Sequence, residues 1–526
     1  MQTNGASSGR KRWMVIGGGL VVVLALAAVP VFSRLVHGDW PGHVRPAVTS
    51  IHPPHHVGDA SQLGAWSDPF PLGMIPIHSV LLNNGQVLMW QYWSTNGNGG
   101  IISGVYNPAS GAVTTLPNPT PVADYFCGGE NQLPDGRILI DGGLDGPQGE
   151  GDKGIKGSVI FDPATTSWQT NASMTYPRYY PTNLVLGNGM DLVFSGFNGN
   201  GTGIIREVEQ YDDVNVAWTT LPTSANLPAG TWEPYPRFFL LPTGSVFSAG
   251  PTQASWFLDP ATYKWSYGPS MQYPNRHGEG AVLLPDLKTV FAFGGQNDLD
   301  NQKVNPTYTI ESADTSLGSN GVWTYGKSMH YARHDLNAVE LPDQTILIVG
   351  GAGGASKYEN PVEQAEQYDP ANATWKILAA QQGQRGYHST AILLPDGTVF
   401  SAGSDSGNSL QTYGEIFSPP YLFKGARPTI TSAPTALTYG ANFTVTTPNA
   451  STITSVVLIR NDADTHATHF DQRIIPLAFT IGSGQLTVTA PVDGNTAPPG
   501  YYMLFIVNST NVPSVAPMVN LPEPTS

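Results

Sequence analysis

Short apolar runs alternate with turn residues along most of the chain, and one such phrase recurs. It consists of an apolar run, a polar turn such as Asn-Gly or Pro-Asp-Gly, and a second apolar run that ends in a pair of small residues. Apolar runs of this length on both sides of a turn predict β-hairpins. The apolar residues just before the turns, spaced by 43 to 57 residues, are Leu82, Leu133, Leu186, Leu241, Leu284, Leu341 and Leu394. A period near 50 residues is typical of kelch blades.

A second turn follows several of these phrases and predicts an outer hairpin. It is an Asp-Pro pair followed by a tryptophan, as in Asp162-Pro163 with Trp168, Asp259-Pro260 with Trp265, and Asp369-Pro370 with Trp375. Inner and outer hairpins together make a four-stranded blade, so the seven repeats predict a seven-bladed kelch β-propeller over residues 61–422. We expect a strand near Trp66 to close it.

The repeat stops after Ser418-Pro419-Pro420, and the remaining chain has a different pattern. Residues 428–526 contain short alternating runs such as NFTVTT, QLTVTA and YYMLFIV. Fewer than 100 residues with closely spaced turns predict an immunoglobulin-like β-sandwich. The expected fold class is therefore all-β.

The amino terminus has the pattern of an export signal. Arg10-Lys11-Arg12 precede a segment, residues 13–33, whose uncharged stretch from Met14 to Phe32 would span roughly 28 Å as a helix. Positive charge before it favours a cytoplasmic tail, residues 1–12, and an exported body. The segment is either a transmembrane signal anchor or a cleaved signal peptide. Residues 34–60 are expected to form a linker, and the body is expected at the cell membrane outside the cytoplasm, or secreted if the signal is cleaved.

Charge and cysteine content narrow the range of functions. The formal net charge is −15 and only 12% of residues are charged, so no basic surface for nucleic acid is expected. A single cysteine, Cys127, excludes an internal disulfide framework and a zinc site built on several thiolates. It leaves one thiol without a cysteine partner.

Cysteine, tyrosine and histidine residues that could bind a metal or take part in catalysis lie just before the recurring phrase in several repeats. Cys127 in DYFCGGE precedes the second phrase, Tyr180 in PRYYPTN the third, and Tyr387-His388 in RGYHST the seventh; His466 lies in the carboxy-terminal region. Positions that lead into innermost strands can converge at one mouth of a propeller channel. Each residue alone also has a structural interpretation, since a lone cysteine is usually a small buried apolar residue.

A glycosidase is a carboxylate-based alternative. It needs two paired acids in the channel. Asp124, Glu130 and Glu233 are available, but no pattern pairs them.

The motifs around these residues resemble those of the copper radical oxidases, the family of galactose oxidase and glyoxal oxidase. The resemblance covers about residues 61–522. The matching motifs are FC-G near LPDGR, R-x-Y before the next repeat, YHS-x-x-LLPDG, SPPYLF, TH-x-x-x-x-DQR and PPGYYMLF.

The resemblance implies a role for each residue. Tyr180 would be a copper ligand joined to Cys127 by a thioether, and would carry a radical. His388 and His466 would be the imidazole ligands, His466 being favoured over His469 by its spacing from DQR. Tyr387 would be the axial phenolate and the general base. The cofactors would be Cu(II) and the Cys127–Tyr180 cross-link.

The implied activity is oxidation of a primary alcohol or small aldehyde by O2, which gives H2O2. Imidazole and phenolate oxygen suit tetragonal Cu(II). The ring that stacks on the cross-linked tyrosine in galactose oxidase aligns with Asn198, and we expect either Asn198 or its neighbour Phe197 at that position. No arginine matches the sugar-contacting one, so we expect small molecules or glycan hydroxyls rather than galactose. The alternative is a non-catalytic surface propeller that binds glycans or proteins without copper.

Overall fold

The computed structural model describes residues 50–55, 58–93, 100–120, 123–145, 153–230, 232–297, 304–406 and 409–524. The predicted tail, the apolar segment 13–33 and most of the linker lie outside these ranges. Among the described residues, no helix is both long and apolar enough to cross a membrane. Helical segments are short: α1 (Ala60–Leu63), and the 3-10 turns Thr223–Ala225, Thr315–Asn320, Pro420–Phe423 and Ala450–Thr452.

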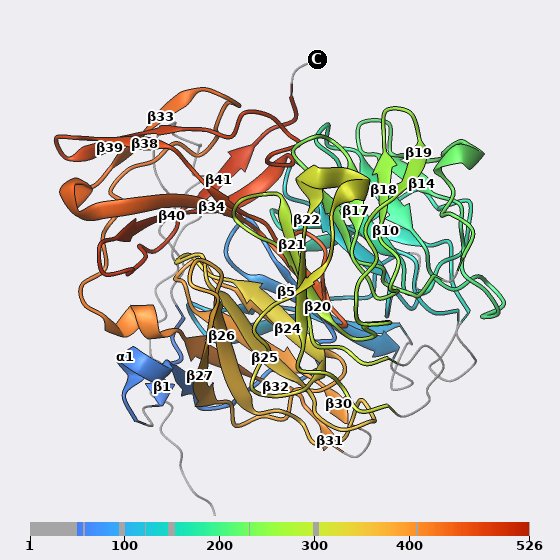
Figure 1. The fold of residues 1–526 in the computed structure, drawn as a ribbon, viewed down its shortest axis with the longest axis horizontal. Coiled ribbons are helices and arrows are strands. Elements are labelled where there is room, and N and C mark those ends of the chain that lie inside the picture. Colours follow the sequence, from blue (N-terminus) through green and yellow to red (C-terminus); the bar gives the residue numbers. More distant parts are fainter. Residues whose placement is uncertain are drawn as a thin grey trace, which may run out of the picture. The chain divides into compact units, whose positions relative to one another are not determined.

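Each recurring phrase forms the first two strands of an antiparallel sheet (Figure 1). The marker leucines follow the first strands directly. At one of them the Leu133 N–H donates to the Arg137 carbonyl, and the Gly136 N–H closes the turn on the Leu133 carbonyl. Gly136 has φ 92, which favours glycine there. The first strands are β4 (His78–Leu81), β8 (Gly129–Gln132), β12 (Thr182–Val185), β16 (Phe238–Leu240), β20 (Gly280–Leu283), β24 (His334–Glu340) and β28 (Ser389–Leu393). The second strands are β5 (Val87–Trp93), β9 (Ile138–Asp141), β13 (Asp191–Phe194), β17 (Val246–Ser248), β21 (Thr289–Phe293), β25 (Ile346–Ala352) and β29 (Val399–Gly403).

The outer hairpins complete these sheets. The Asp-Pro turn links β10 to β11, with Phe161 opposite Trp168. The third strands are β6 (Ile101–Asn107), β10 (Ser158–Asp162), β14 (Glu209–Asp212), β18 (Trp256–Asp259), β22 (Ile310–Asp314), β26 (Gln364–Asp369) and β32 (Tyr413–Ser418). The fourth strands are β7 (Ala112–Thr115), β11 (Ser167–Thr170), β15 (Ala217–Thr220), β19 (Lys264–Tyr267), β23 (Thr324–Tyr325) and β27 (Thr374–Ala380).

First strands of successive sheets contact one another, which places them innermost. β8 contacts β12, β12 contacts β16, β20 contacts β24, β24 contacts β28, and β28 contacts β4. In the last sheet the fourth position is taken by β2 (Ala65–Ser67), where Trp66 pairs with Phe417 of β32. The expected closing strand near Trp66 is therefore present. The fold is all-β and propeller-like.

The carboxy-terminal strands form a two-sheet sandwich, drawn orange to red in Figure 1. One sheet has the order β33 (Asn442–Thr446), β39 (Gln485–Thr489), β38 (Phe479–Gly482); the other has the order β37 (Ile474–Pro476), β34 (Ile453–Arg460), β40 (Gly500–Asn508), β41 (Met518–Leu521). Between the sheets lies a cluster that includes Val445, Leu458 and Leu504. Val457 and Phe505 belong instead to a cluster with Leu341 and Leu394, so this domain shares core with the propeller.

One hairpin of the sandwich domain enters the centre of the propeller. It comprises β35 (Ala463–Thr465) and β36 (Thr468–His469), and β35 pairs with the first strand β4. Thr465 lies opposite His78. The Ala391 N–H of β28 donates to the Asp464 carboxylate at 2.7 Å. This hairpin brings His466 among the innermost strands.

Candidate metal centre

Four of the predicted site residues have left-handed backbone conformations. The φ angles are 54° at Cys127, 64° at Tyr180, 65° at His388 and 52° at His466. A non-glycine residue in this region costs on the order of 1–3 kcal/mol and persists only where its surroundings hold it. Such strain is concentrated at functional sites, and here it occurs at four of the five predicted site residues.

The structure brings the predicted residues together from distant parts of the chain. The hydroxyl oxygens of Tyr180 and Tyr387 lie 2.5 Å apart. The Cys127 Sγ lies 3.2 Å from His466 Nε2, and the His388 and His466 ring centroids are 4.4 Å apart. Cys127 and Tyr180 share one apolar cluster, and the Tyr180 N–H donates to the Cys127 carbonyl at 2.8 Å.

Neighbouring polar groups set which nitrogen of each imidazole carries the proton. His388 Nδ1 lies 2.8 Å from Asp405 Oδ1, which makes it the protonated nitrogen and leaves Nε2 with the lone pair. The Thr465 hydroxyl donates to the Ile77 carbonyl, so its oxygen accepts from His466 Nδ1 at 2.6 Å. Nε2 of His466 is then also a lone-pair donor. Both His388 nitrogens are buried and lack a hydrogen-bond partner among the described residues, but Nδ1 has its ion-pair contact with Asp405 and Nε2 does not.

Burial sets the charge state of the centre. It lowers the pKa of both His388 and His466, so the imidazoles are neutral at neutral pH. Burial also raises the pKa of Tyr180 and of Tyr387 well above the usual phenol value. Without a cation, both phenols therefore keep their protons.

The Asp471-Gln472-Arg473 motif fastens the hairpin to inner strands of three different sheets. The Gln132 N–H of β8 donates to Asp471 at 2.7 Å, and the Glu340 N–H of β24 donates to the Gln472 side-chain oxygen at 2.7 Å. Arg473 donates to the Leu240 carbonyl of β16. Inner-edge backbone groups would otherwise lack partners, so the motif gives the loop that carries His466 a fixed position.

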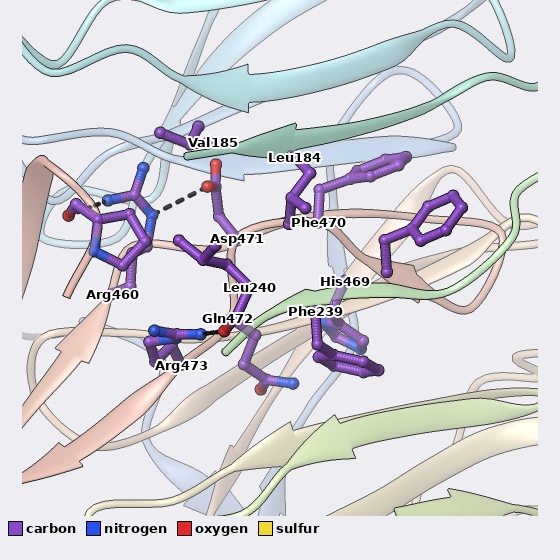
Figure 2. A pocket seen from close by; sticks show the side chains of 12 residues that line it. Leu184, Val185, Phe239, Leu240, Arg460, His469, Phe470, Asp471, Gln472 and Arg473 are labelled. Atoms are coloured by element: carbon purple, nitrogen blue, oxygen red, sulfur yellow. Dashed lines mark hydrogen bonds and ion pairs between the residues drawn. The ribbon is translucent and has the colours of Figure 1, made fainter. Parts of the chain in front are cut away.

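Figure 2 shows the residues of this anchor around a small cavity of about 30 Å³. The Arg460 guanidinium contacts the Asp471 carboxylate, with 2.9 Å between Nε and Oδ1. Arg460 also donates to the Pro498, Pro499 and Gln132 carbonyls. The buried charge is thus fully partnered, as a stable buried ion pair requires.

A larger cavity of about 280 Å³ opens beside the two phenols. The Lys357 ammonium lies 3.5 Å from the Tyr387 ring centroid, a cation–π contact. Arg237 also lines the cavity, and its guanidinium donates to the carbonyls of Tyr235 and Glu279. The lining is Tyr180, Phe197, Glu233, Pro234, Tyr235, Arg237, Pro251, His277, Gly278, Gln296, Asp335, Lys357, Tyr387 and His466.

Of the two residues considered for ring stacking, only Phe197 lies against Tyr180. Its ring centroid is 6.5 Å from that of Tyr180, with the planes at 89°, so the contact is edge-on. Asn198 instead accepts from the N–H groups of Asn200 and Thr202, within its own turn. The role of shielding the ring stays a prediction.

Sequence reasoning missed several neighbours of the centre. Tyr235 lies 4.9 Å from Tyr180 and 5.2 Å from His466, centroid to centroid, and its hydroxyl donates to the Gly128 carbonyl. Asp405 and Lys357 were also missed. Tyr235 follows Glu233, one of the acids considered for a glycosidase, and no periodic signal distinguishes these residues from ordinary loop positions.

The donor set suits a copper ion. The ligand atoms of Cys127, His388 and His466 all lie within 4.8 Å of one another. Two neutral imidazole nitrogens and two phenol oxygens form the N,O set that Cu(II) prefers. A metal ion would give the buried His388 Nε2, which has no hydrogen-bond partner among the described residues, a partner of its own.

Comparisons with known proteins agree with this geometry. Residues 427–521 match a family model described as "Galactose oxidase-like, Early set domain". Galactose oxidase from Gibberella zeae is 28% identical over 495 residues, which cover 88% of this chain and 71% of the relative. An aldehyde oxidase, GLOX, from Vitis pseudoreticulata is 27% identical over 443 residues, which cover 76% of this chain and 82% of the relative.

A solved structure extends the similarity to three dimensions. It is a novel fungal alcohol oxidase of the AA5 family in complex with copper. The TM-score is 0.77 at 26% identity, over 88% of this chain and all of that one.

Proposed function

Because the chain belongs to the copper radical oxidase family, we propose that Cys127, Tyr180, Tyr387, His388 and His466 form its catalytic centre. The protein is a copper-dependent alcohol or aldehyde oxidase. The observation that carries the residue assignment is that five residues spread over 339 positions meet at one point, with a sulfur 3.2 Å from an imidazole and two phenols 2.5 Å apart.

In this proposal His388, His466, Tyr180 and Tyr387 hold the copper. When bound, copper would supply a one-electron acceptor and a Lewis acid that makes the substrate hydroxyl more acidic. Tyr387 lines the cavity and takes the hydroxyl proton of the substrate as general base. Tyr180, joined to Cys127, takes a hydrogen atom from the carbon. Overall the substrate loses two electrons and two protons, and one O2 becomes H2O2.

The cavity supports a substrate of modest size. Its volume of about 280 Å³ and its mixed aromatic and charged lining fit a primary alcohol or aldehyde with polar substituents. Arg237 lines the cavity and donates from two of its nitrogens to backbone carbonyls. We propose substrates other than galactose, including primary hydroxyls of glycans.

We also propose the number of blades, the type of the carboxy-terminal domain and the role of the amino-terminal segment. We infer that the sheets β4–β7 to β28–β32 are seven kelch blades over residues 61–422, followed by the immunoglobulin-like domain 428–526. We also propose that segment 13–33 holds the enzyme at the cell membrane with its body outside the cytoplasm.

The test loads copper-free protein with Cu(II) in air. We expect the intact mass to fall by two hydrogens and the Cys127–Tyr180 peptide to run as one cross-linked species. A panel of alcohols and aldehydes should then release peroxide. Cys127→Ser should bind copper, keep its mass and lose turnover on the order of a thousandfold or more.

A non-catalytic propeller predicts the opposite results. It would show no specific copper binding and a freely titratable Cys127 thiol. An active, copper-replete protein with an unmodified thiol would refute the cross-link while leaving the oxidase activity in place.

A further inference from the structure

A buried histidine–glutamate pair lies directly behind Cys127 and plays no part in the proposed chemistry. His78 and Glu130 are both fully buried, and His78 Nδ1 lies 2.9 Å from Glu130 Oε2 and 3.1 Å from Oε1. His78 stands on β4 and Glu130 on β8, so the pair links the inner strands of two neighbouring sheets. It is not exposed to the cavity beside the phenols, whose lining includes neither residue.

The other nitrogen of this imidazole holds the backbone of Cys127. The Cys127 N–H donates to His78 Nε2 at 2.9 Å. An accepting Nε2 carries no proton, so Nδ1 carries it and donates to the Glu130 carboxylate. The contact with Glu130 thus fixes the His78 tautomer that is protonated on Nδ1. Its one ring lone pair, on Nε2, accepts from the Cys127 N–H.

The Cys127 backbone has a strained conformation that its surroundings must stabilise. Cys127 has φ 54, a conformation that a non-glycine residue leaves unless its surroundings keep it there. The following residues are two glycines, Gly128 and Gly129, which impose little conformation of their own. The direction of the Cys127 side chain toward Tyr180 therefore depends on contacts of its own backbone.

Trp90 fixes the imidazole in turn. Its ring lies 4.4 Å from that of His78 with the planes at 8°, and its Nε1 donates to the Tyr125 carbonyl two residues before Cys127. The stacked ring can keep its place without a hydrogen bond to Cys127. Packing and hydrogen bonding at this histidine can therefore be separated by mutation.

We propose that His78, oriented by Glu130, is a positioning residue for cross-link formation: its Nε2 holds the Cys127 backbone so that Sγ faces the Tyr180 ring. The inference rests on the proposed function. In the step concerned, the S–H and one ring C–H bond break and an S–C bond forms. The two electrons and two protons released reduce one O2 to H2O2, with copper present.

The test follows cross-linking in full-length copper-free protein after addition of Cu(II) in air. His78→Leu removes the acceptor, whereas His78→Gln places an amide oxygen near the position of Nε2. We expect His78→Leu to slow the loss of two hydrogen masses by roughly tenfold to a hundredfold, the effect of leaving one buried donor unpaired. His78→Gln should recover most of the rate.

Two further readouts separate positioning from packing. Hydrogen exchange of the peptide that contains Cys127 should quicken in His78→Leu but not in His78→Gln. Trp90→Phe disturbs the packing of the same imidazole and also removes the hydrogen bond from Trp90 Nε1 to the Tyr125 carbonyl. It should slow cross-linking less than His78→Leu does, since the hydrogen bond from the Cys127 N–H to His78 survives.

Several results would overturn the proposal. Wild-type rates in His78→Leu would do so, as would equal slowing in Trp90→Phe and His78→Leu, because contacts other than the hydrogen bond from Cys127 to His78 would then explain the effect. Equal slowing in His78→Gln and His78→Leu would show that the acceptor is not what matters. If the wild-type protein itself never loses two hydrogens, it is the proposed cross-link that fails, and the comparison of variants by hydrogen exchange still reports on His78.

Discussion

The hydroxyl oxygens of Tyr180 and Tyr387 lie 2.5 Å apart, although the residues are separated by 207 positions in the chain. Each phenol stands just before the first strand of its own sheet, β12 or β28. Because one hydroxyl donates a hydrogen bond to the other, a change in the protonation of one phenol alters the hydrogen bonding of the other. The proposed division of labour gives the radical to Tyr180 and the base to Tyr387.

Tyr387→Phe separates these two roles. The cross-link should still form, because Cys127 and Tyr180 are unchanged, and the mass should still fall by two hydrogens. Turnover should fall by about 10²- to 10⁴-fold, the usual contribution of a general base. Peroxide release and intact mass measure the two effects on one sample.

A neighbouring tyrosine provides the control for this variant. Tyr358 lies 6.2 Å from Tyr387, ring to ring, and is 39% exposed. Tyr358→Phe should keep turnover near the wild-type value. Equal losses in both variants would assign the effect to local packing rather than to the Tyr387 hydroxyl.

Two histidines three residues apart test the metal assignment. His466 presents Nε2 to the centre, whereas His469 Nδ1 lies 2.5 Å from Asp462 Oδ2. His466→Ala should remove one nitrogen coupling from the Cu(II) EPR spectrum and weaken binding. His469→Gln should keep the coupling, and its loss there instead would reverse the assignment.

The anchor of the hairpin should matter for copper as well as for folding. Asp471→Asn leaves the buried Arg460 charge without its carboxylate, which typically costs about 3–5 kcal/mol. We expect a lower free energy of unfolding in urea and weaker copper binding, because His466 is held by the same loop. Asp135→Asn, at an exposed pair with Arg137, should cost about 1 kcal/mol or less. Unchanged copper affinity in a destabilised Asp471→Asn would separate the anchor from the site.

Local patterns predicted the parts of the fold that depend on neighbouring residues. Leu133 and Leu394 directly follow the first strands β8 and β28, because an apolar run and its turn fold within a few residues. Cys127, Tyr180, Tyr387 and His388 were predicted as site residues at the same points of the repeats, and His466 was predicted from the resemblance of its motif in the carboxy-terminal domain. The hydrogen bond from Thr465 to Ile77 was not predictable, since it joins residues 388 positions apart and depends on the hairpin entering the channel. The edge-on orientation of Phe197 depends in the same way on tertiary packing.

Buried carboxyl groups near the centre of the propeller give the protein a pH-dependent stability. Burial raises the pKa of Glu340 from 4.5 to about 8, and the nearby Arg473 offsets only part of this effect. Between these two pH values the folded protein holds a proton that the unfolded chain has released. The free energy of unfolding therefore falls as pH rises from about 4.5 to about 8.

Glu340→Gln should reduce this slope, because the amide stays neutral at every pH while its shape is similar. Relative to wild type, the variant should gain on the order of a few degrees in Tm at pH 8 and nothing below pH 4.5. Thermal unfolding followed by circular dichroism across this range measures the difference. The exposed Glu363→Gln is the control and should leave the profile unchanged. A Tm difference between Glu340→Gln and wild type that is the same at all pH values would show that the carboxyl does not titrate in this window, and that its effect comes from packing beside Gln472, whose side chain accepts from the Glu340 N–H.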